Sequence, residues 1–570
     1  MKVVIVGGVA GGATAAARLR RLNEEAEIIV LERTGYVSYA NCGLPYYIGG
    51  TIQDKGALTL QTPESFRARF NIDVRVKNEV LSVQPEEHTV TVRRLEDGSE
   101  YTETYDKLIL SPGAKAIRPP LPGIDLEGIF TLRTVEDTFR IRNFLERERP
   151  KSAVVVGGGF IGLEMAENLI HAGVRTTMIQ LDDQVLLPLD KDLAGEVHAY
   201  LQGQGLDLRL STAVTGFRRR GGKLEALIGE QPPVEADLVI LAIGVAPESD
   251  LARRAGLTLG QKGAIVVDEH MRTSHPDIYA VGDAVELTHA VTGQKALVAL
   301  AGPANRQGRV AADHICGLNQ GYAGAQGSSI LKLFDMTAAA TGLNERSAKA
   351  AGVAYDKAVT YSASHATYYP GARNMTVKTL FDPATGRILG AQIVGFDGVD
   401  KRIDVLATAI RAGLTARQLT ELDLAYAPPY SSAKDPVNMA GYVIENLRAG
   451  LVEQHHWDQV AGLPADGSVI LLDVRTPDEV KQQGLLRPDA VHIPLDELRQ
   501  RLGELDPAKK VYVNCVSGLR SYVACRILSQ KGFRCSNLSG GWRFWSYAAT
   551  DRTHDAAPTH PCGCLLYTSP

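Results

Sequence analysis

The sequence predicts an α/β protein built from several domains, and three patterns carry that prediction. The first is a strand, a glycine-rich turn and a helix at residues 3–21, and the second is the same succession at residues 153–171. The third is a strand at residues 510–514 that leads through a cysteine-containing loop into a helix. Apolar strands that alternate with helices are typical of parallel sheets. A chain of 570 residues is too long for one core, so we expect three or four domains.

Composition argues against several classes of protein. The formal net charge is −4, so no overall basic field indicates nucleic acid or an anionic membrane as a partner. Seven cysteines are too few for a disulfide framework, and the first residues enter a strand without the features of a signal peptide. No apolar run reaches the ~18 residues of a membrane span. We therefore expect a cytoplasmic protein in which exposed thiols are more often catalytic than structural.

The first strand, Val3–Val6, ends in a glycine turn that suits a dinucleotide. Glycine lets the backbone approach a pyrophosphate, which the free N–H groups at the start of the following helix can bind. This alanine-rich helix continues through Arg21, and the next strand, Ile28–Leu31, ends at Glu32, where a ribose-binding carboxylate is expected. The turn residues are Gly7, Gly8, Val9, Ala10, Gly11 and Gly12.

A second unit of the same kind begins with the strand Ala153–Val156, and its helix extends to about His171. Two such units in one chain indicate a flavin together with a nicotinamide nucleotide. Its second strand, Thr176–Ile179, ends at Gln180 instead of a carboxylate. An amide accepts ribose hydroxyl bonds less strongly and does not repel a 2′-phosphate, so NADH and NADPH both stay open. Further residues of this unit are Gly157, Gly159, Ile161, Gly162 and Glu164.

Three further short strands fit the return of the chain between these units. Leu108–Leu110 leads into a Pro-Gly turn, and Leu238–Ile243 is its counterpart after the second unit. The strand Ile278–Ala280 is followed by Gly282 and Asp283 at the start of a helix. The Asp283 carboxylate can bind a ribityl hydroxyl of a flavin or cap the helix, and the sequence leaves both open.

The stretch Ser38–Tyr47 holds a single cysteine, Cys42, shortly after the first dinucleotide unit. No second cysteine lies near it along the chain, so redox chemistry at Cys42 requires a partner sulfur from outside. A lone cysteine is also compatible with a role as a small apolar residue. Its position after a predicted flavin unit favours redox chemistry. Ser38 and Asn41 beside it are candidates for substrate binding.

Together these motifs resemble the single-cysteine branch of the pyridine nucleotide–disulfide oxidoreductases. The resemblance also rests on the Ser-x-x-Asn-Cys-Gly-Leu-Pro-Tyr block from Ser38, the Gly-Asp-Ala segment at 282–284 and the segment Ala301–Gly308. It covers about residues 1–450, and within the branch the chain is most similar to coenzyme A-disulfide reductases. Peroxidase and oxidase relatives carry a histidine in the first glycine turn, where this chain has Ala10. That difference favours thiol–disulfide chemistry over a cysteine sulfenate.

The resemblance implies bound FAD and NADH or NADPH, with Cys42 beside the isoalloxazine ring. It implies FAD on Gly7, Gly12, Glu32 and Asp283, and the nicotinamide nucleotide near Gly157, Gly159, Gly162 and Glu164. The other candidates for cofactor binding are Arg33, Gly113, Gly244, Gly282, Pro303 and Asn305.

From about residue 328 to 448 the pattern changes to alternating apolar strands, such as Met375–Phe381 and Ile388–Val394, followed by a helix over Arg402–Ala412. The resemblance implies an α+β dimerisation domain that completes the active site of the partner in a homodimer. Tyrosines of this region are candidates to face the cysteine, because a phenol can donate a proton to a thiolate leaving group. They are equally compatible with ordinary interface packing. The candidates are Tyr368, Tyr426 and Tyr430.

The last part of the chain predicts a separate α/β unit with a second reactive cysteine. The strand Ser468–Leu472 ends in Asp473-Val474-Arg475. The strand Lys510–Asn514 leads into the loop 515–521, whose sequence is Cys-Val-Ser-Gly-Leu-Arg-Ser. The N–H groups of such a loop, and of the helix after it, stabilise a thiolate or persulfide anion at Cys515.

With Gly540-Gly541-Trp542, these motifs resemble a rhodanese domain over about 90 residues. Arg520 is expected to assist the Cys515 anion, whereas Cys525 and Cys535 are expected to be packed thiols. Polysulfide or a thiol persulfide suits the loop better than thiosulfate, because a dianion would find one arginine and no lysine there.

The expected domains follow from these units. They are an FAD-binding domain at 1–113 and 246–322, an NAD(P)-binding domain at 114–245, a dimerisation domain at 323–450, a rhodanese domain at 460–548 and a disordered tail at 549–570. His455 and His456 lack neighbouring ligands, so no metal site is predicted. Cys562 and Cys564 of the tail are compatible with metal binding or disulfide exchange but have no companion ligands.

The sequence thus predicts a homodimeric flavoenzyme that uses NAD(P)H to reduce coenzyme A persulfide, polysulfide or coenzyme A disulfide through Cys42. The rhodanese domain would relay sulfane sulfur. Two alternatives stay open: an NADH oxidase or peroxidase, and a sulfur carrier or sensor with a non-catalytic flavin half. Coenzyme A carries phosphates, so Arg18 and Arg21, which share one helix face, are candidates for its nucleotide end. A solvated helix face explains them equally well.

Overall fold

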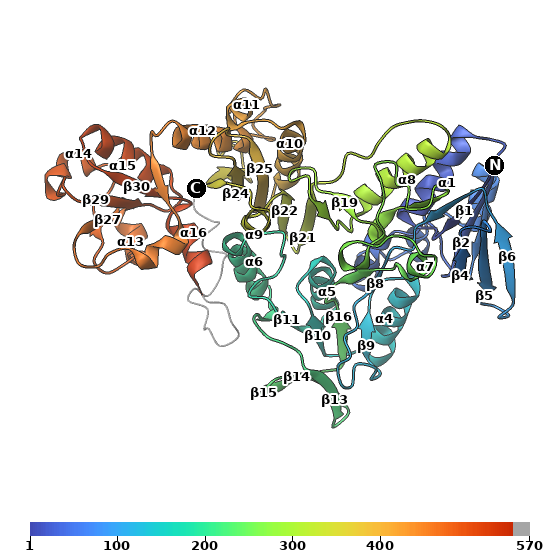
Figure 1. The fold of residues 1–570 in the computed structure, drawn as a ribbon. Helices are drawn as coiled ribbons and strands as arrows, with labels where there is room; N and C mark the ends of the chain where they lie inside the picture. The colour runs from blue at the N-terminus through green and yellow to red at the C-terminus, as the bar shows by residue number, and fades with distance from the viewer. Residues whose placement is uncertain (551–570) are drawn as a thin grey trace. The chain divides into compact units, whose positions relative to one another are not determined.

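The computed structural model describes residues 1–550, which form two compact units (Figure 1). The first unit comprises residues 1–181 and 212–327, and the second comprises residues 182–211 and the chain from residue 328 onward. The segment 182–211, which follows a strand of the first unit, thus clusters with the second. The finer domain boundaries expected from the sequence stay a prediction, and Cys562 and Cys564 lie outside the described residues.

The first sheet of unit 1 is parallel and carries the first glycine turn. Its strands, in the spatial order β18-β7-β1-β2-β3, are Ile278–Ala280, Lys107–Leu110, Lys2–Val6, Glu27–Glu32 and Asp73–Val76. Helix α1 begins at Ala10, inside the turn rather than after it, because Ala13 N–H already bonds to Val9 O at 2.8 Å. It packs against α8 (Ala301–Ile315), where a Cβ on Gly308 would lie only 2.3 Å from Gly11 O. The two glycines therefore permit a close approach of the helices.

A second parallel sheet of unit 1 repeats this arrangement. Its strands run β11-β10-β16-β9, with bounds Arg175–Ile179, Ser152–Val156, Leu238–Leu241 and Ile129–Thr131. Helix α5 (Phe160–His171) follows β10 as the sequence predicts, and α4 (Val135–Glu148) follows β9. Strand β16 ends two residues earlier than expected, since the chain turns toward Gly244, whose φ is +112°.

Two antiparallel three-stranded sheets complete unit 1. They are β4-β5-β6 at Asn78–Gln84, Thr89–Arg94 and Glu100–Thr104, and β13-β14-β15 at Gly216–Arg220, Lys223–Ile228 and Gln231–Ala236. A short pair, β8 (Ala114–Ala116) and β17 (Val245–Pro247), joins the two connections between the dinucleotide units.

Unit 2 contains an antiparallel sheet, as the alternating pattern predicts. Its strands run β21-β22-β25-β24-β23, with bounds Ser329–Leu333, Met336–Gly342, Ile388–Gly395, Asn374–Phe381 and Asp356–Ala363. The helices of this region are α6 (Lys191–Gly203), α10 (Val399–Ala412) and α12 (Pro436–Arg448). Helix α10 begins three residues before the predicted start at Arg402, because Gly398, at a φ of +67°, turns the chain into the helix.

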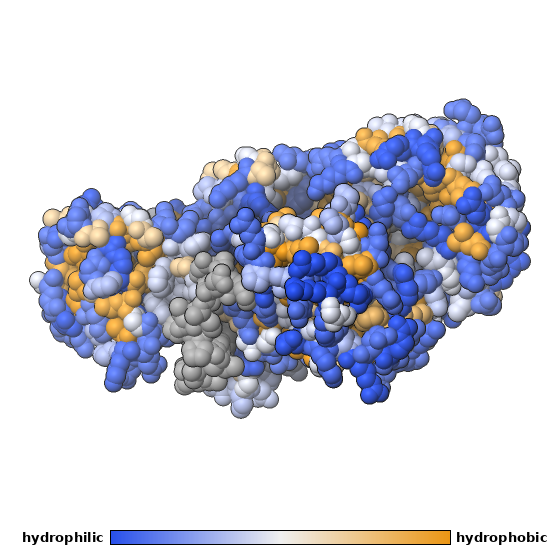
Figure 2. All heavy atoms as spheres, turned by 90° about the horizontal axis from the view of Figure 1, so that it is seen from below, coloured by the Kyte–Doolittle hydropathy of each residue, from blue (hydrophilic) through white to orange (hydrophobic). Residues whose placement is uncertain are grey.

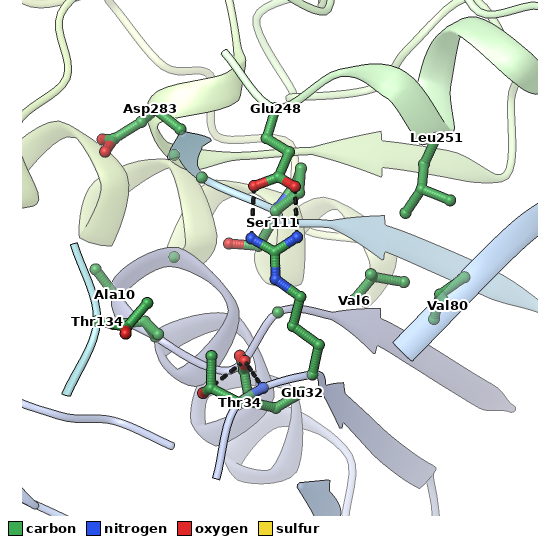
Figure 3. A pocket seen from close by; sticks show the side chains of 18 of the residues that line it. Val6, Ala10, Glu32, Thr34, Val80, Ser111, Thr134, Glu248, Leu251 and Asp283 are labelled. Carbon is green, nitrogen blue, oxygen red and sulfur yellow. Dashed lines mark hydrogen bonds and ion pairs between the residues drawn. The ribbon is translucent and has the colours of Figure 1, made fainter. Parts of the chain in front are cut away.

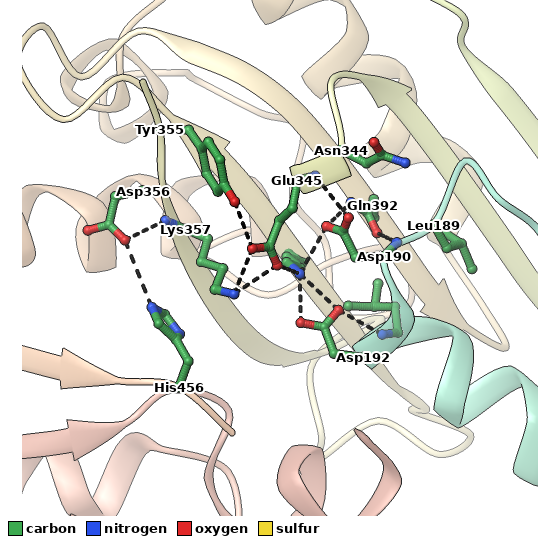
Figure 4. Close-up of polar contacts among 12 residues, drawn as sticks. Leu189, Asp190, Asp192, Asn344, Glu345, Tyr355, Asp356, Lys357, Gln392 and His456 are labelled. Carbon is green, nitrogen blue, oxygen red and sulfur yellow. Dashed lines mark hydrogen bonds and ion pairs between the residues drawn. The ribbon is translucent and has the colours of Figure 1, made fainter. Parts of the chain in front are cut away.

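A buried charge network fixes the segment 182–211 to this sheet (Figure 4). The ammonium group of Lys378, on β24, lies 2.9 Å from Asp190, 2.6 Å from Asp192 and 2.6 Å from Glu345. Lys357 adds a second cation at 2.8 Å from Glu345. The carboxylates are close enough together to share a metal ion, but the Lys378 ammonium lies among them and supplies the compensating charge.

The C-terminal part of unit 2 is a second parallel sheet, in the order β26-β30-β29-β27-β28. Its strands are Glu453–His455, Cys535–Leu538, Lys510–Asn514, Val469–Asp473 and Val491–His492, and its helices include α13 (Pro477–Gln483), α15 (Leu519–Gln530) and α16 (Gly541–Ala549). Helix α16 packs against α6, where a Cβ on Gly195 would lie 2.5 Å from Tyr547 O. Unit 2 thus combines an antiparallel α+β region with a parallel α/β sheet.

On the face drawn in Figure 2, hydrophobic residues form separate patches among hydrophilic ones. Within residues 1–550, no helix is both long and apolar enough to cross a membrane.

Candidate active site

A cleft of about 320 Å³, partly open to solvent, lies at the carboxyl ends of β1, β2 and β7 (Figure 3). This is the edge at which parallel α/β sheets bind ligands. The predicted cofactor residues that line it are Gly7, Val9, Ala10, Gly11, Glu32, Arg33, Gly113, Gly282 and Asp283, and Asn41 is there too. The cleft therefore collects residues that lie far apart along the chain.

The first glycine turn is shaped by steric limits that only glycine meets. Gly7 has a φ of +97°, and a Cβ there would lie 2.1 Å from Ser111 O. A Cβ on Gly12 would lie 1.9 Å from Gly7 O. The buried Glu32 carboxylate accepts a hydrogen bond from Gly8 N at 2.9 Å and another from Thr34 N at 2.8 Å. The turn and the acid at the end of β2 thus hold one another in place, next to the space of the cleft.

Two ion pairs across the cleft could not be read from the sequence. Arg33 forms a two-pronged contact with Glu248, at 2.5 and 2.7 Å, and Figure 3 marks both contacts at the Glu248 carboxylate. Arg133 lies 2.7 Å from Asp283. The helix-capping alternative for Asp283 is wrong, because Val281 occupies the cap position and the carboxylate turns to Arg133 instead.

The second glycine turn has the same geometry with an amide in place of the acid. Gln180 Oε1 accepts from Gly158 N at 2.7 Å, just as Glu32 accepts from Gly8 N. Gly157 has a φ of +105°, and a Cβ on Gly162 would lie 1.9 Å from Gly157 O. A Cβ on Gly159 would meet nothing within 4 Å, so the space beside this residue is free for a ligand.

Cys42 lies in a short turn, Asn41–Gly43, directly before α2 (Leu44–Ile48). Its thiol is exposed, although neighbouring protein atoms still desolvate it in part. This desolvation and the nearby Glu164 carboxylate raise the pKa of Cys42, whereas Arg133 opposes the shift. Ser38, with a φ of +47°, anchors the segment by donating its N–H to Gly8 O at 2.8 Å. The cysteine segment is thus fixed to the first glycine turn.

Glu164 connects the second dinucleotide unit to the cysteine segment. Helix α2 packs against α5, and the Tyr46 hydroxyl hydrogen bonds with the Glu164 carboxyl group. Burial and the Glu167 carboxylate raise the pKa of Glu164 to about 7. The sequence offers Glu164 only as a nucleotide contact, because the sequence pattern does not reveal that it lies near Cys42.

The three candidate tyrosines belong to unit 2 and form a surface cluster there. The Tyr368 and Tyr426 hydroxyl groups hydrogen bond at 2.8 Å. Tyr368 is 73% exposed and Tyr430 is 71% exposed, so large aromatic areas face outward. Exposed aromatic surface of this kind is typical of interfaces between chains.

Cys515 has a different environment, fully buried at the end of β29. Its Sγ accepts hydrogen bonds from Gly518 N at 3.1 Å and from Ser521 Oγ at 3.2 Å. Its carbonyl accepts from Trp542 N at 2.7 Å, and the Arg475 guanidinium lies over the Trp542 ring at 5.2 Å. The three motifs that resemble a rhodanese domain therefore meet around this one sulfur.

Arg520 hydrogen bonds with Cys515 and also forms an ion pair with a carboxylate. It forms two hydrogen bonds with Glu479, at 2.9 and 2.8 Å. These bonds raise the pKa of Arg520, and Cys515 adds to that shift. Glu479 reduces the net positive charge available to a dianionic donor.

The remaining candidates lie at the edges of the predicted sites. Arg18 pairs with Asp313 of α8 at 2.6 Å, whereas Arg21 is exposed. Asn305, on α8, accepts from the Thr14 hydroxyl at 2.5 Å, and Pro303, two residues earlier, is buried. The role proposed for the two arginines in coenzyme A binding stays a prediction.

The histidines of the join between domains have separate partners. His455 is buried and hydrogen bonds with Ser536 at 3.1 Å, and burial lowers its pKa to about 3. His456 lies 3.9 Å from Asp356 (Figure 4).

Comparison with known proteins agrees with this architecture. Residues 1–308 match the family of pyridine nucleotide-disulphide oxidoreductases, residues 328–436 its dimerisation domain, and residues 456–548 the rhodanese-like domain. Coenzyme A disulfide reductase of Staphylococcus haemolyticus is 37% identical over 447 residues, which are 78% of this chain and 100% of that protein.

Two solved structures extend the similarity through the C-terminal domain. One is the reduced CoADR-RHD of Bacillus anthracis, with a TM-score of 0.94, 46% identity, and coverage of 97% of this chain and 98% of that one. The other is a NAD-dependent persulfide reductase from A. fulgidus, with a TM-score of 0.90, 40% identity, and coverage of 96% and 100%. The chain is therefore an oxidoreductase that belongs to the pyridine nucleotide-disulphide oxidoreductase family and ends in a rhodanese-like domain.

Proposed function

We propose that this enzyme reduces coenzyme A persulfide, polysulfide or coenzyme A disulfide with electrons from NADH or NADPH, through FAD and Cys42. The observation that carries the proposal is the placement of a single exposed thiol, Cys42, on a segment fixed to the glycine turn of a dinucleotide cleft. The names of the relatives agree with it, since they reduce coenzyme A disulfide or persulfides. The second sulfur is then that of the substrate.

The residues around the cleft fit FAD. The N–H groups at the start of α1 suit the pyrophosphate, Glu32 suits a ribose, and the Arg133–Asp283 pair supplies polar partners deeper in the cleft. The free space beside Gly159 suits the pyrophosphate of the nicotinamide nucleotide. Bound FAD would accept a hydride from that nucleotide and supply two electrons.

The protein's own contribution is to hold and activate a sulfur nucleophile. The Cys42 thiolate attacks one sulfur of coenzyme A disulfide, forms a mixed disulfide and releases one coenzyme A thiolate. Two electrons and a proton then return Cys42 to its reduced form and release the second coenzyme A. Glu164, with a pKa of about 7, is close enough to influence the charge of Cys42 at neutral pH.

The tyrosine cluster supports a homodimer in this proposal. Tyr368, Tyr426 and Tyr430 are exposed on the region that matches the family's dimerisation domain. In a homodimer they would face Cys42 of the partner subunit, and a phenol would then protonate the departing thiolate.

Gln180 lies where a ribose-binding carboxylate would distinguish NADH from NADPH. Its neutral amide does not repel the 2′-phosphate of NADPH, so the proposal includes both nucleotides.

One steady-state comparison tests the proposal. Oxidation of NADH and of NADPH is followed anaerobically with coenzyme A persulfide, coenzyme A disulfide and hydrogen peroxide as acceptors. We expect turnover with the coenzyme A substrates and little with peroxide, because Ala10 stands where peroxidase relatives have a histidine. Turnover with peroxide alone, or turnover only when air is admitted, would instead indicate a peroxidase or an oxidase. A bound flavin that NADH and NADPH cannot reduce would leave only a carrier or sensor function.

A further inference from the structure

The rhodanese-like domain contains two thiols in mutual contact that the chemistry of Cys515 does not use. Cys525 lies on α15 and Cys535 begins β30, and these two elements pack together. The Cys535 thiol lies 3.3 Å from the Cys525 carbonyl oxygen, to which it donates, and the two thiol groups also hydrogen bond with each other. A dithiol therefore exists within one domain, in contrast to the isolated Cys42.

The two sulfurs differ in access and charge. Cys525 is 1% exposed, whereas Cys535 is partly exposed. The hydrogen bond between the thiols raises the pKa of Cys525 and lowers that of Cys535. Arg526 and Lys510 also lower the pKa of Cys535, whereas desolvation and Glu453 oppose the shift. Cys535 is thus the sulfur that an external reagent reaches first and that ionises more readily, and Cys525 is placed to react second.

We propose that Cys525 and Cys535 are a redox-active pair that sulfane sulfur oxidises to a disulfide. In the first step the Cys535 thiolate attacks a terminal sulfane sulfur of a polysulfide or persulfide, forms a persulfide on Cys535 and releases the shortened thiol. In the second step the proton of Cys525 passes to the terminal persulfide sulfur, the Cys525 sulfur attacks Cys535 Sγ, and the terminal sulfur leaves as hydrosulfide. In sum, two protein thiols and one substrate persulfide give one protein disulfide, one substrate thiol and one hydrogen sulfide. Atoms and electrons therefore balance, and the persulfide is the oxidant.

The placement of the pair separates it from the sulfur-carrying cysteine. Cys515 belongs to the same buried cluster, and its Sγ is occupied by the donors Gly518 and Ser521 at the start of α15. Cys525 follows Ser521 by one helical turn on the same helix. A disulfide between Cys525 and Cys535 would therefore link α15, whose first turn contacts the Cys515 sulfur, covalently to β30. The inference is independent of the flavin half, since neither step uses NAD(P)H.

Peptide mapping of the full-length holoenzyme tests the pair directly. The reduced protein is treated anaerobically with inorganic polysulfide, alkylated and digested with trypsin, which cuts after Arg520, Arg526, Arg534 and Arg543. The two cysteines then fall on separate peptides, 521–526 and 535–543. We expect these peptides to be joined after treatment and to separate on reduction with a thiol. Equal alkylation of both cysteines with and without polysulfide would overturn the proposal.

Three variants decide the order of the steps. Cys525→Ala should trap Cys535 with one added sulfur atom, and Cys535→Ala should leave Cys525 reduced and alkylatable. Cys515→Ser should still form the 525–535 link, and this variant is the matched control because it removes a thiol of the same domain. A link from Cys515 to either cysteine, or loss of the 525–535 link in Cys515→Ser, would reject the assignment. Anaerobic NADH oxidation with preformed coenzyme A persulfide should be unchanged in Cys535→Ala.

Discussion

Cys42 and Cys515 both precede helices, yet their sulfurs have opposite surroundings. Cys515 is buried, and its own chain directs a backbone N–H and a hydroxyl group at the sulfur. Cys42 is exposed, and its surroundings favour the neutral thiol through desolvation and Glu164. The difference teaches that the donors at the Cys515 sulfur come from its own loop and helix, within six residues of the cysteine. Among the groups that act on Cys42, Arg133 is the one that favours its thiolate.

The largest effect is expected from Cys42→Ser. Reduction of coenzyme A persulfide by NADH should fall by at least about 10³-fold, because the variant lacks the nucleophile. Reduction of the bound flavin by NADH should persist, as stopped-flow bleaching would record. The control is Cys316→Ser, at the end of α8, which should retain activity. Equal loss of activity in Cys42→Ser and Cys316→Ser would mean that replacing a cysteine disturbs the fold, rather than that Cys42 is the nucleophile.

Cys515→Ser should separate the two halves of the reaction. Activity that begins from polysulfide and free coenzyme A should disappear, since the rhodanese-like domain can no longer carry the sulfur. Activity on preformed coenzyme A persulfide should remain within about twofold, because it needs only Cys42. NADH oxidation is measured with polysulfide plus coenzyme A and with coenzyme A persulfide. Loss of activity with both substrates would assign Cys515 to the reductive step. Full activity with both would refute the transfer of sulfur through Cys515.

Ser521→Ala should lower the reactivity of Cys515, and this effect should be smaller than the loss of activity in the two cysteine variants. A hydrogen bond to a charged group contributes about 1.5–3 kcal/mol, so alkylation of Cys515 at fixed pH should slow roughly 10- to 100-fold. The rate at which iodoacetamide alkylates Cys515 is measured by mass spectrometry in the wild type and in the variant. Ser546→Ala, on α16 of the same domain, is the control. An unchanged rate would show that the Gly518 N–H suffices.

Glu479→Gln should improve the use of thiosulfate. The change removes the negative charge opposite Arg520, so more positive charge is available to a dianion. We expect this to stabilise the bound dianion by about 1 kcal/mol, which corresponds to a rise of roughly fivefold in kcat/KM. Sulfur transfer from thiosulfate to cyanide is the assay. Glu504→Gln removes a comparable surface ion pair with Arg501 and should have no effect. A decrease in Glu479→Gln would mean that Glu479 positions Arg520 rather than neutralises it.

The smallest effect concerns the pH dependence of Cys42. Below pH about 7 Glu164 is protonated, and above it the carboxylate opposes ionisation of the Cys42 thiol. Glu164→Gln removes that charge, so alkylation of Cys42 should set in at lower pH than in the wild-type enzyme. A titration of the alkylation rate against pH records the shift, with Glu146→Gln on the exposed face of α4 as control. A shift to higher pH would contradict the sign of the interaction.

The sequence by itself determined the fold class and the local motifs, because these depend on short-range physics. A β-branched run before glycines and an alanine-rich helix can adopt few other structures, and β1, β24, β25 and β29 all begin within one residue of their predicted starts. The loop of Cys515 was recognisable for the same reason, since its donors Gly518 and Ser521 follow it within six residues.

Only the tertiary structure decided which charges meet. Arg133 and Asp283 are 150 residues apart, Arg33 and Glu248 are 215 apart, and neither pair leaves a signal in spacing or composition. The same holds for Glu164 near Cys42 and for Glu479 opposite Arg520. Electrostatic energy depends on distance and burial rather than on position along the chain, so pairs of this kind exist only once the sheets and helices have packed.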